Sequence, residues 1–127
     1  MSSSRKISRI KALQILFAWE FSQPKNLNLV TEIVDLTNEE FTKTLISEYL
    51  KNEQTIDLLI ISKLKNWKLN RVNYIDKNIL RLGCLELMLK TADKAVVLNE
   101  YINIAKEFGT ENSGGFVNGI LDSIDID

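Results

Sequence analysis

The chain has 127 residues, 45% of them hydrophobic, with 16 basic and 17 acidic residues and a net charge of −1. These values fit a single domain over residues 1–127, and they argue against binding nucleic acid through overall charge while leaving local basic patches possible. The absence of histidine and the single cysteine, Cys84, exclude an internal disulfide, zinc sites built on Cys and His, and Ser-His or Cys-His nucleophile pairs. No signal-peptide pattern begins the chain, so a cytoplasmic protein is expected.

The N-terminal segment is basic. Residues 1–11 carry four positive charges and no negative charge. On a helix, Arg5, Lys6 and Arg9 would share an arc of about 100°. Such a cluster suits a phosphate backbone. The alternative, which these residues taken alone favour, is a solvated and partly frayed terminus.

Apolar spacing predicts a first helix from Ile10 to Phe21. Its end is expected at Pro24, because proline has no N–H with which to continue the helix. The sequence favours core positions for Phe17 and Trp19.

After a short segment from 27 to 34, residues 37–40 have the pattern of a helix start, with a Thr cap and acids in the first turn. Two further helices are predicted, one through about residue 50 and one over about 55–67. A second basic run follows, which we interpret as a solvated face; it contains Lys63, Lys65, Lys68, Arg71 and Lys77.

The stretch 74–89 is predicted to be the central helix. Its apolar side chains point almost all the way round a helix axis, so other elements must surround it. Gly83 indicates that another backbone comes close. Arg81 is expected where the helix nears the surface, and Glu86 has the i,i+4 spacing to pair with Lys90.

Two more amphipathic helices are predicted, one from about Val97 to Phe108 and one from Phe116 to Ile124. Gly109 is expected to end the first of these as a C′ glycine, and Gly119 indicates close approach to a neighbour. No strand pattern stands out. The prediction is an all-α fold of about seven helices around a central buried helix.

The junction between these two helices, residues 110–115, is polar. Ser113 can cap the last helix, and the glycines leave backbone N–H groups accessible to an anion. Because the junction lacks a Walker lysine pattern and a preceding strand, an ordinary helix cap is the competing interpretation.

Three blocks of sequence, in register with one another, resemble the family of the bacterial transcription antitermination factor NusB. They are residues 9–20, 76–87 and 98–122, and the most specific part is the string Phe116-Val117-Asn118-Gly119-Ile120-Leu121-Asp122. The resemblance extends over essentially the whole chain.

This resemblance implies two packed helical bundles and no catalysis, so no catalytic residue, metal or cofactor is expected. It implies binding to the boxA element of nascent ribosomal RNA transcripts, paired with a small-subunit ribosomal protein that is called NusE in this role. The complex helps RNA polymerase to pass terminators.

By the same resemblance, the RNA-binding residues come from the basic N-terminus and from the junction with its flanking aromatic residues: Arg5, Lys6, Arg9, Phe108, Asn112, Ser113 and Phe116. The partner-binding residues lie on the first and central helices: Phe17, Glu20, Asp76 and Arg81. Basic groups that hold a backbone and rings that stack on bases are a common combination in single-strand binding. Phe108 and Phe116 also fit the apolar faces of their own helices, and Arg81 could simply pair with a neighbouring carboxylate.

Two other functions remain open on the sequence. The chain could be a fragment of a ribosomal RNA methyltransferase that carries a domain of this kind, although such an enzyme needs a following cofactor-binding domain. It could also be a helical protein-interaction module without an RNA role, which a salt titration with single-stranded RNA would distinguish.

Overall fold

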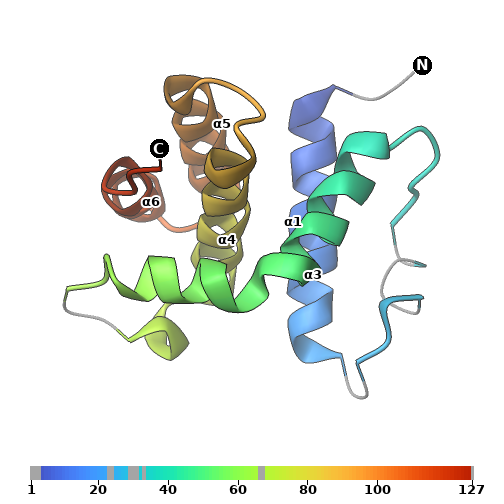
Figure 1. Ribbon diagram of the computed structural model, residues 1–127, viewed down its shortest axis with the longest axis horizontal. Coiled ribbons are helices and arrows are strands. Elements are labelled where there is room, and N and C mark those ends of the chain that lie inside the picture. Colours follow the sequence, from blue (N-terminus) through green and yellow to red (C-terminus); the bar gives the residue numbers. More distant parts are fainter. Residues whose placement is uncertain (1–3, 23–24, 29–31, 33, 66–67, 127) are drawn as a thin grey trace.

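The structure is a computed structural model that describes residues 4–22, 25–28, 32, 34–65 and 68–126 (Figure 1). In this part of the chain there are five α-helices and one 3-10 helix: α1 (Arg5–Phe21), α3 (Glu40–Ile61), η1 (Leu69–Arg71), α4 (Tyr74–Leu89), α5 (Lys94–Phe108) and α6 (Ser113–Asp122). None of these described residues is in a strand, so the predicted all-α class is confirmed. Over the described residues the number of α-helices is five, not the expected number of about seven.

Helix α3 extends from the first of the two helices predicted here into the second, and the boundary expected between them falls at a kink. The chain passes through a kink at Asn52, whose φ and ψ are −123° and 16°. The Asn52 side chain donates to the backbone oxygen of Glu48 at 2.7 Å, a local bond of the kind that bends helices. The helix resumes immediately, and Tyr49 and Ile56 on either side of the kink are both buried.

The helix ends also differ in part from expectation. Helix α1 begins at Arg5, where the Ser4 hydroxyl accepts from the backbone N–H of Ile7, so the basic segment is helical rather than frayed. Helix α3 begins at Glu40 without a side-chain cap. The predicted stop at Pro24, the predicted helix end at Trp67 and part of the segment 27–34 lie outside the described residues.

Helix α4 lies at the centre of the molecule, as predicted. It packs against α1, α3, α5 and α6, and in Figure 1 it lies between α1 and α6 while α3 crosses at its lower end. Residues 76–80 and 82–87 are buried. Its N-cap is Asn73, whose side-chain oxygen accepts from the backbone N–H of Asp76 at 2.8 Å.

Close packing explains two of the glycines and not the third. A Cβ at Gly83 would lie 2.6 Å from Leu121 Cδ1, so α6 approaches α4 there as predicted. Gly109 ends α5 with φ of −95°, so it is not the left-handed C′ residue that we expected. Its Cβ would instead collide with Ser113 Oγ at 2.3 Å. The expected close approach at Gly119 is wrong, because nothing lies within 4 Å of a Cβ there.

Among the described residues, no helix combines the length and the apolar character that crossing a membrane requires.

Substitution of Leu85 by alanine should lower the free energy of unfolding by about 2–5 kcal/mol, because Leu85 is fully buried in α4 and its removal leaves a cavity. Urea unfolding measures the loss. The matched control is Leu58→Ala on α3, where the side chain is 66% exposed and the change should be within about 0.5 kcal/mol. Equal losses in the two variants would contradict the central position of α4.

Candidate RNA and partner interfaces

The first two basic residues of α1 are exposed and lie against α5 and the α4–α5 connection. Arg5 Nη1 donates to the backbone oxygen of Thr91 at 2.9 Å. Lys6 Nζ lies 3.6 Å from the Glu107 carboxylate, and both side chains are about half exposed. Because Glu107 precedes Phe108, the ion pair places Lys6 beside the junction that follows α5. Two parts of the predicted RNA site are therefore adjacent.

Arg9, in contrast, is buried and cannot reach an RNA strand in this structure. It is 3% exposed, and its Nε and Nη2 each donate to the Glu86 carboxylate at 2.8 Å. Thr91 Oγ1 donates to the same carboxylate at 2.7 Å, and the hydroxyl of Tyr101 also donates to it. Arg9 thus forms an internal ion pair in this structure. The expected pair of Glu86 with Lys90 is wrong.

Burial and charge keep Arg9 and Tyr101 each in one protonation state. Burial raises the pKa of the Tyr101 hydroxyl well above its ordinary value, and the neighbouring Glu86 carboxylate raises it further. Burial opposes the charge on Arg9, but the hydrogen bonds and charge of Glu86 outweigh it and raise the pKa of Arg9. Tyr101 therefore remains a donor and Arg9 remains a cation.

Two of the predicted partner-binding residues, Glu20 and Arg81, pair with each other. Arg81 Nη1 donates to Glu20 Oε1 at 3.1 Å, and its Nε and Nη2 donate to Asp57 at 2.9 and 3.0 Å. Lys77 and Asn78 donate to Glu20 at 2.7 and 3.1 Å. Lys77 is buried here, so it does not belong to the solvated face that we expected. Arg81 thus takes the alternative role, an internal pair with carboxylates.

This network keeps Glu20 ionised. Burial would raise the pKa of Glu20, but the bonds from Lys77 and Asn78 and the charge of Arg81 lower it below its ordinary value of 4.5. The stabilisation that the carboxylate provides is therefore complete above pH 4.5 and is lost as the pH falls further.

An exposed aromatic cluster lies beside this network, formed by Phe17, Phe21 and Tyr74. Phe21 contacts both other rings, with centroids 5.2 Å from Phe17 and 4.5 Å from Tyr74. The three side chains are 37%, 51% and 44% exposed, in chain order. The core position favoured for Phe17 is therefore wrong, while Trp19 is half-buried. Sequence reasoning missed Phe21 and Tyr74, although the i,i+4 spacing of the two phenylalanines was a usable signal.

An apolar groove of about 260 Å³ extends from this cluster, lined by Phe17 of α1, Ile75 of α4 and Phe108 of α5 among others. Phe108 is 44% exposed, so its ring is available to a partner or a base and is not a core residue. Phe17 and Phe108, which were predicted for different partners, line the same groove.

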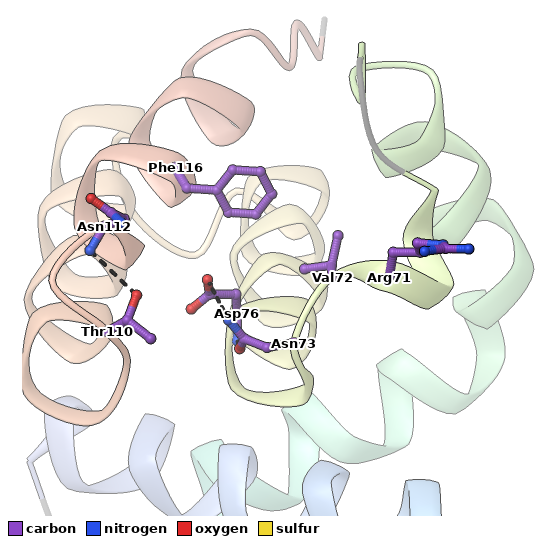
Figure 2. A pocket seen from close by; sticks show the side chains of 7 residues that line it. All are labelled: Arg71, Val72, Asn73, Asp76, Thr110, Asn112 and Phe116. Atoms are coloured by element: carbon purple, nitrogen blue, oxygen red, sulfur yellow. Dashed lines mark hydrogen bonds between the residues drawn. The ribbon is translucent and has the colours of Figure 1, made fainter.

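A second cavity, the Asp76 pocket, lies on the other side of the first turn of α4. Its volume is about 320 Å³, and its lining residues are Arg71, Val72, Asn73, Asp76, Thr110, Asn112 and Phe116 (Figure 2). Asp76 is only 5% exposed, and its Oδ2 accepts from Asn73 Nδ2 at 3.0 Å. Among the residues that the structure describes, Asp76 Oδ1 has no hydrogen-bond partner. Phe116 packs partly against the core and also lines this pocket.

Ser113 shapes the junction instead of facing a ligand. It is fully buried, and its Oγ accepts from the backbone N–H of Thr110 at 2.8 Å. The expected cap of α6 is not formed by Ser113, which is itself the first residue of the helix; the N-cap is Asn112. Asn112 is exposed at the edge of the Asp76 pocket.

Comparison with known proteins decides the family. Residues 6–125 match the model of the NusB family. The chain belongs to this family. It is 35% identical to the transcription antitermination protein NusB of Fervidobacterium nodosum, over 98% of this chain and 92% of the relative.

Solved structures agree with this assignment. The NusB of T. maritima superposes with a TM-score of 0.88 at 39% identity, covering 96% of this chain and 90% of the other. A chain of a crystal structure of the antitermination factors NusB and NusE in complex with dsRNA superposes with a TM-score of 0.80 at 28% identity, covering 94% and 93%. The predicted family is confirmed.

Within this NusB fold, the predicted site residues fall into three groups. The first group lies along α1 and at the end of α5 and consists of Arg5, Lys6, Phe17 and Phe108. The second group lines one pocket and consists of Asp76, Asn112 and Phe116. The remaining residues are held inside the molecule by hydrogen bonds or ion pairs: Arg9, Glu20, Arg81 and Ser113.

Replacing Arg9 by glutamine should lower the free energy of unfolding by about 3–5 kcal/mol, because Glu86 would keep a buried charge without its bidentate partner. The control is Arg5→Gln at the exposed end of α1, which should cost about 1 kcal/mol or less. The double variant Arg9→Gln, Glu86→Gln should lose less than the sum of the two single changes. Urea unfolding in which Arg9→Gln costs no more than Arg5→Gln would contradict a buried pair.

Proposed function

We propose that this protein is a non-enzymatic transcription antitermination factor that acts in the cytoplasm. It binds the boxA element of nascent ribosomal RNA transcripts together with the small-subunit ribosomal protein NusE. The observation that carries this proposal is the superposition on the NusB chain of a structure described as NusB and NusE with dsRNA, over 94% of this chain.

The partner surface in this proposal is the aromatic cluster together with the apolar groove. Three rings that contact one another at the surface form an apolar patch of the kind that marks protein interfaces, and aromatic anchors carry much of the binding energy there. Glu20 and Arg81 support this surface by fixing α1 on α4, because their polar groups are already paired. We therefore assign them a structural role at the edge of the interface.

The RNA surface comprises the exposed end of α1 and the junction after α5. Arg5 and Lys6 provide charge for the phosphate backbone, and Phe108 and Phe116 provide rings on which bases can stack. Arg9 and Ser113 are left out of the binding set because both are buried.

The decisive experiment measures binding of a boxA-like single-stranded RNA with and without the ribosomal protein. The proposal requires that RNA binds more tightly when the ribosomal protein is present. It also requires that the affinity for RNA falls as the salt concentration rises. A helical interaction module without an RNA role would bind the protein partner and show no RNA binding under either condition.

Phe21→Asp should weaken binding of the ribosomal protein by about 30-fold, because a charge would be buried among the rings of the aromatic cluster. The fold should be unaffected, since Phe21 is half exposed. Val96→Asp, at an equally exposed apolar position in the first turn of α5, is the matched control and should leave the affinity unchanged. Calorimetric titration that finds equal affinities for both variants would place the interface elsewhere.

Lys6→Gln should weaken RNA binding and reduce the slope of log affinity against log salt by about 0.7, the value for one phosphate contact on a single strand. The control is Lys43→Gln on α3, which removes a lysine that is likewise exposed and paired with a nearby glutamate. Fluorescence anisotropy over a range of salt concentrations provides both slopes. An unchanged slope for Lys6→Gln would remove the end of α1 from the RNA surface.

A further inference from the structure

We infer that the Asp76 pocket receives one base of the bound RNA and selects a base with an exocyclic amine, which donates a hydrogen bond to Asp76 Oδ1. This inference rests on the proposed RNA-binding function and adds a position of base selectivity to it.

The first observation is the unpartnered oxygen itself. Asp76 is 5% exposed, and of its two carboxylate oxygens only Oδ2 has a partner among the described residues, Asn73 Nδ2. Among the described residues nothing donates to Oδ1, which belongs to a residue that lines the pocket. A buried acceptor without a partner is destabilising, so a ligand whose donor reaches this oxygen is favoured. The pocket therefore favours a ligand with a donor at this point.

The second observation is the shape and chemistry of the walls. Figure 2 shows the Phe116 ring and the Asp76 carboxylate facing the same hollow, with Asn112 and Thr110 on one side and Val72 on the other. An aromatic ring beside an aliphatic side chain offers an apolar face to a flat molecule, and stacking on such a ring does not depend on which base is present. The volume of about 320 Å³ lies at the lower end of the range of small-molecule sites, which is large enough for one base.

The third observation is the charge at the edge of the pocket. Arg71 lies in η1 at the outer side, exposed to solvent. A guanidinium there attracts the phosphate of a nucleotide whose base occupies the pocket. It repels any lysine or arginine side chain of a protein partner that approaches Asp76. The charges thus favour a nucleotide over a cationic side chain.

Acceptor chemistry then distinguishes the bases. Cytosine presents an amine at N4, and a carboxylate is a fitting acceptor for it. The only ring N–H of uracil lies between two carbonyl oxygens. If this N–H donated to Asp76, both carbonyl oxygens would approach the carboxylate and be repelled by it. An amine-bearing base is therefore expected to bind better than uracil at one position of the strand.

The test uses a 12-nucleotide oligouridylate in which a single cytidine is moved through every position. Wild-type protein, saturated with the ribosomal protein, should prefer cytidine over uridine at one position by about 5- to 150-fold, the range for one specific base contact. Asp76→Asn should lose this preference, so that cytidine and uridine bind within about twofold of each other at that position. Asp122→Asn, which removes one exposed carboxylate at the end of α6, is the control and should retain the preference.

A test on the RNA side does not require a variant that folds. At the preferred position, N4,N4-dimethylcytidine has no N–H to donate, so wild-type protein should lose the preference. N4-methylcytidine keeps one N–H and should retain most of it. If both modified bases bind as cytidine does, the inference is wrong.

The remaining outcomes separate the inference from the proposed function. If wild-type protein binds none of these strands and no boxA-like RNA, the proposed function fails and the inference fails with it. If the strands bind without preference at any position, or Asp76→Asn keeps the preference, only the inference fails. If Asp76→Asn leaves base selection unchanged and instead weakens binding of the ribosomal protein, Asp76 contacts that partner and the inference is overturned.

Discussion

The bidentate ion pair between Arg9 and Glu86 joins the two sides of the molecule. Glu86 belongs to the central helix, Arg9 comes from α1, and Tyr101 donates to the same carboxylate from α5. A carboxylate with no solvent exposure costs several kcal/mol to desolvate, so it is stable only when its donors are all in place. The position of α1 relative to α5 is therefore tied to one buried charge. The contact of Lys6 with Glu107 and the groove between Phe17 and Phe108 depend on the same arrangement.

The fold was predictable where it depends on apolar spacing. The buried central helix at 74–89 follows directly from its sequence, because apolar side chains on almost all of its faces must be buried by other elements. The predicted division of α3 into two helices falls at the kink at Asn52, but the sequence does not show that the chain continues there without a loop. A single bond from Asn52 to a backbone oxygen lets the helix bend and continue there. Gly109 illustrates the same limit, since its role is set by Ser113 packing against it and not by its own dihedral angles.

The candidate site was harder to predict, because burial of a charge depends on distant residues. Lys6 and Arg9 are three positions apart and look alike in the sequence, yet one is exposed and the other is bonded to a residue 77 positions away. For the aromatic residues the apolar pattern was equally ambiguous. Phe17 fits a core stripe but lies at the surface, because Phe21 and Tyr74 form a patch with it outside the core. The family resemblance names the elements that carry the predicted site, and the structure is needed to separate their inward and outward side chains.

The distribution of charge has a consequence for how the proposed complex assembles. Arg9, Lys77 and Arg81 are all engaged in internal pairs, so of the predicted basic arm only Arg5 and Lys6 remain exposed. Few phosphate contacts mean that RNA binding by this chain alone is weak and that its dependence on salt is shallow. The aromatic cluster behaves differently, because burial of rings is not screened by ions. On the proposed function, association with the ribosomal protein is therefore favourable at ionic strengths where this chain alone holds RNA weakly. The RNA then binds a surface formed by both proteins, to which the partner adds its own contacts. RNA binding depends on that partner because Arg9, Lys77 and Arg81 of this chain are engaged in internal ion pairs.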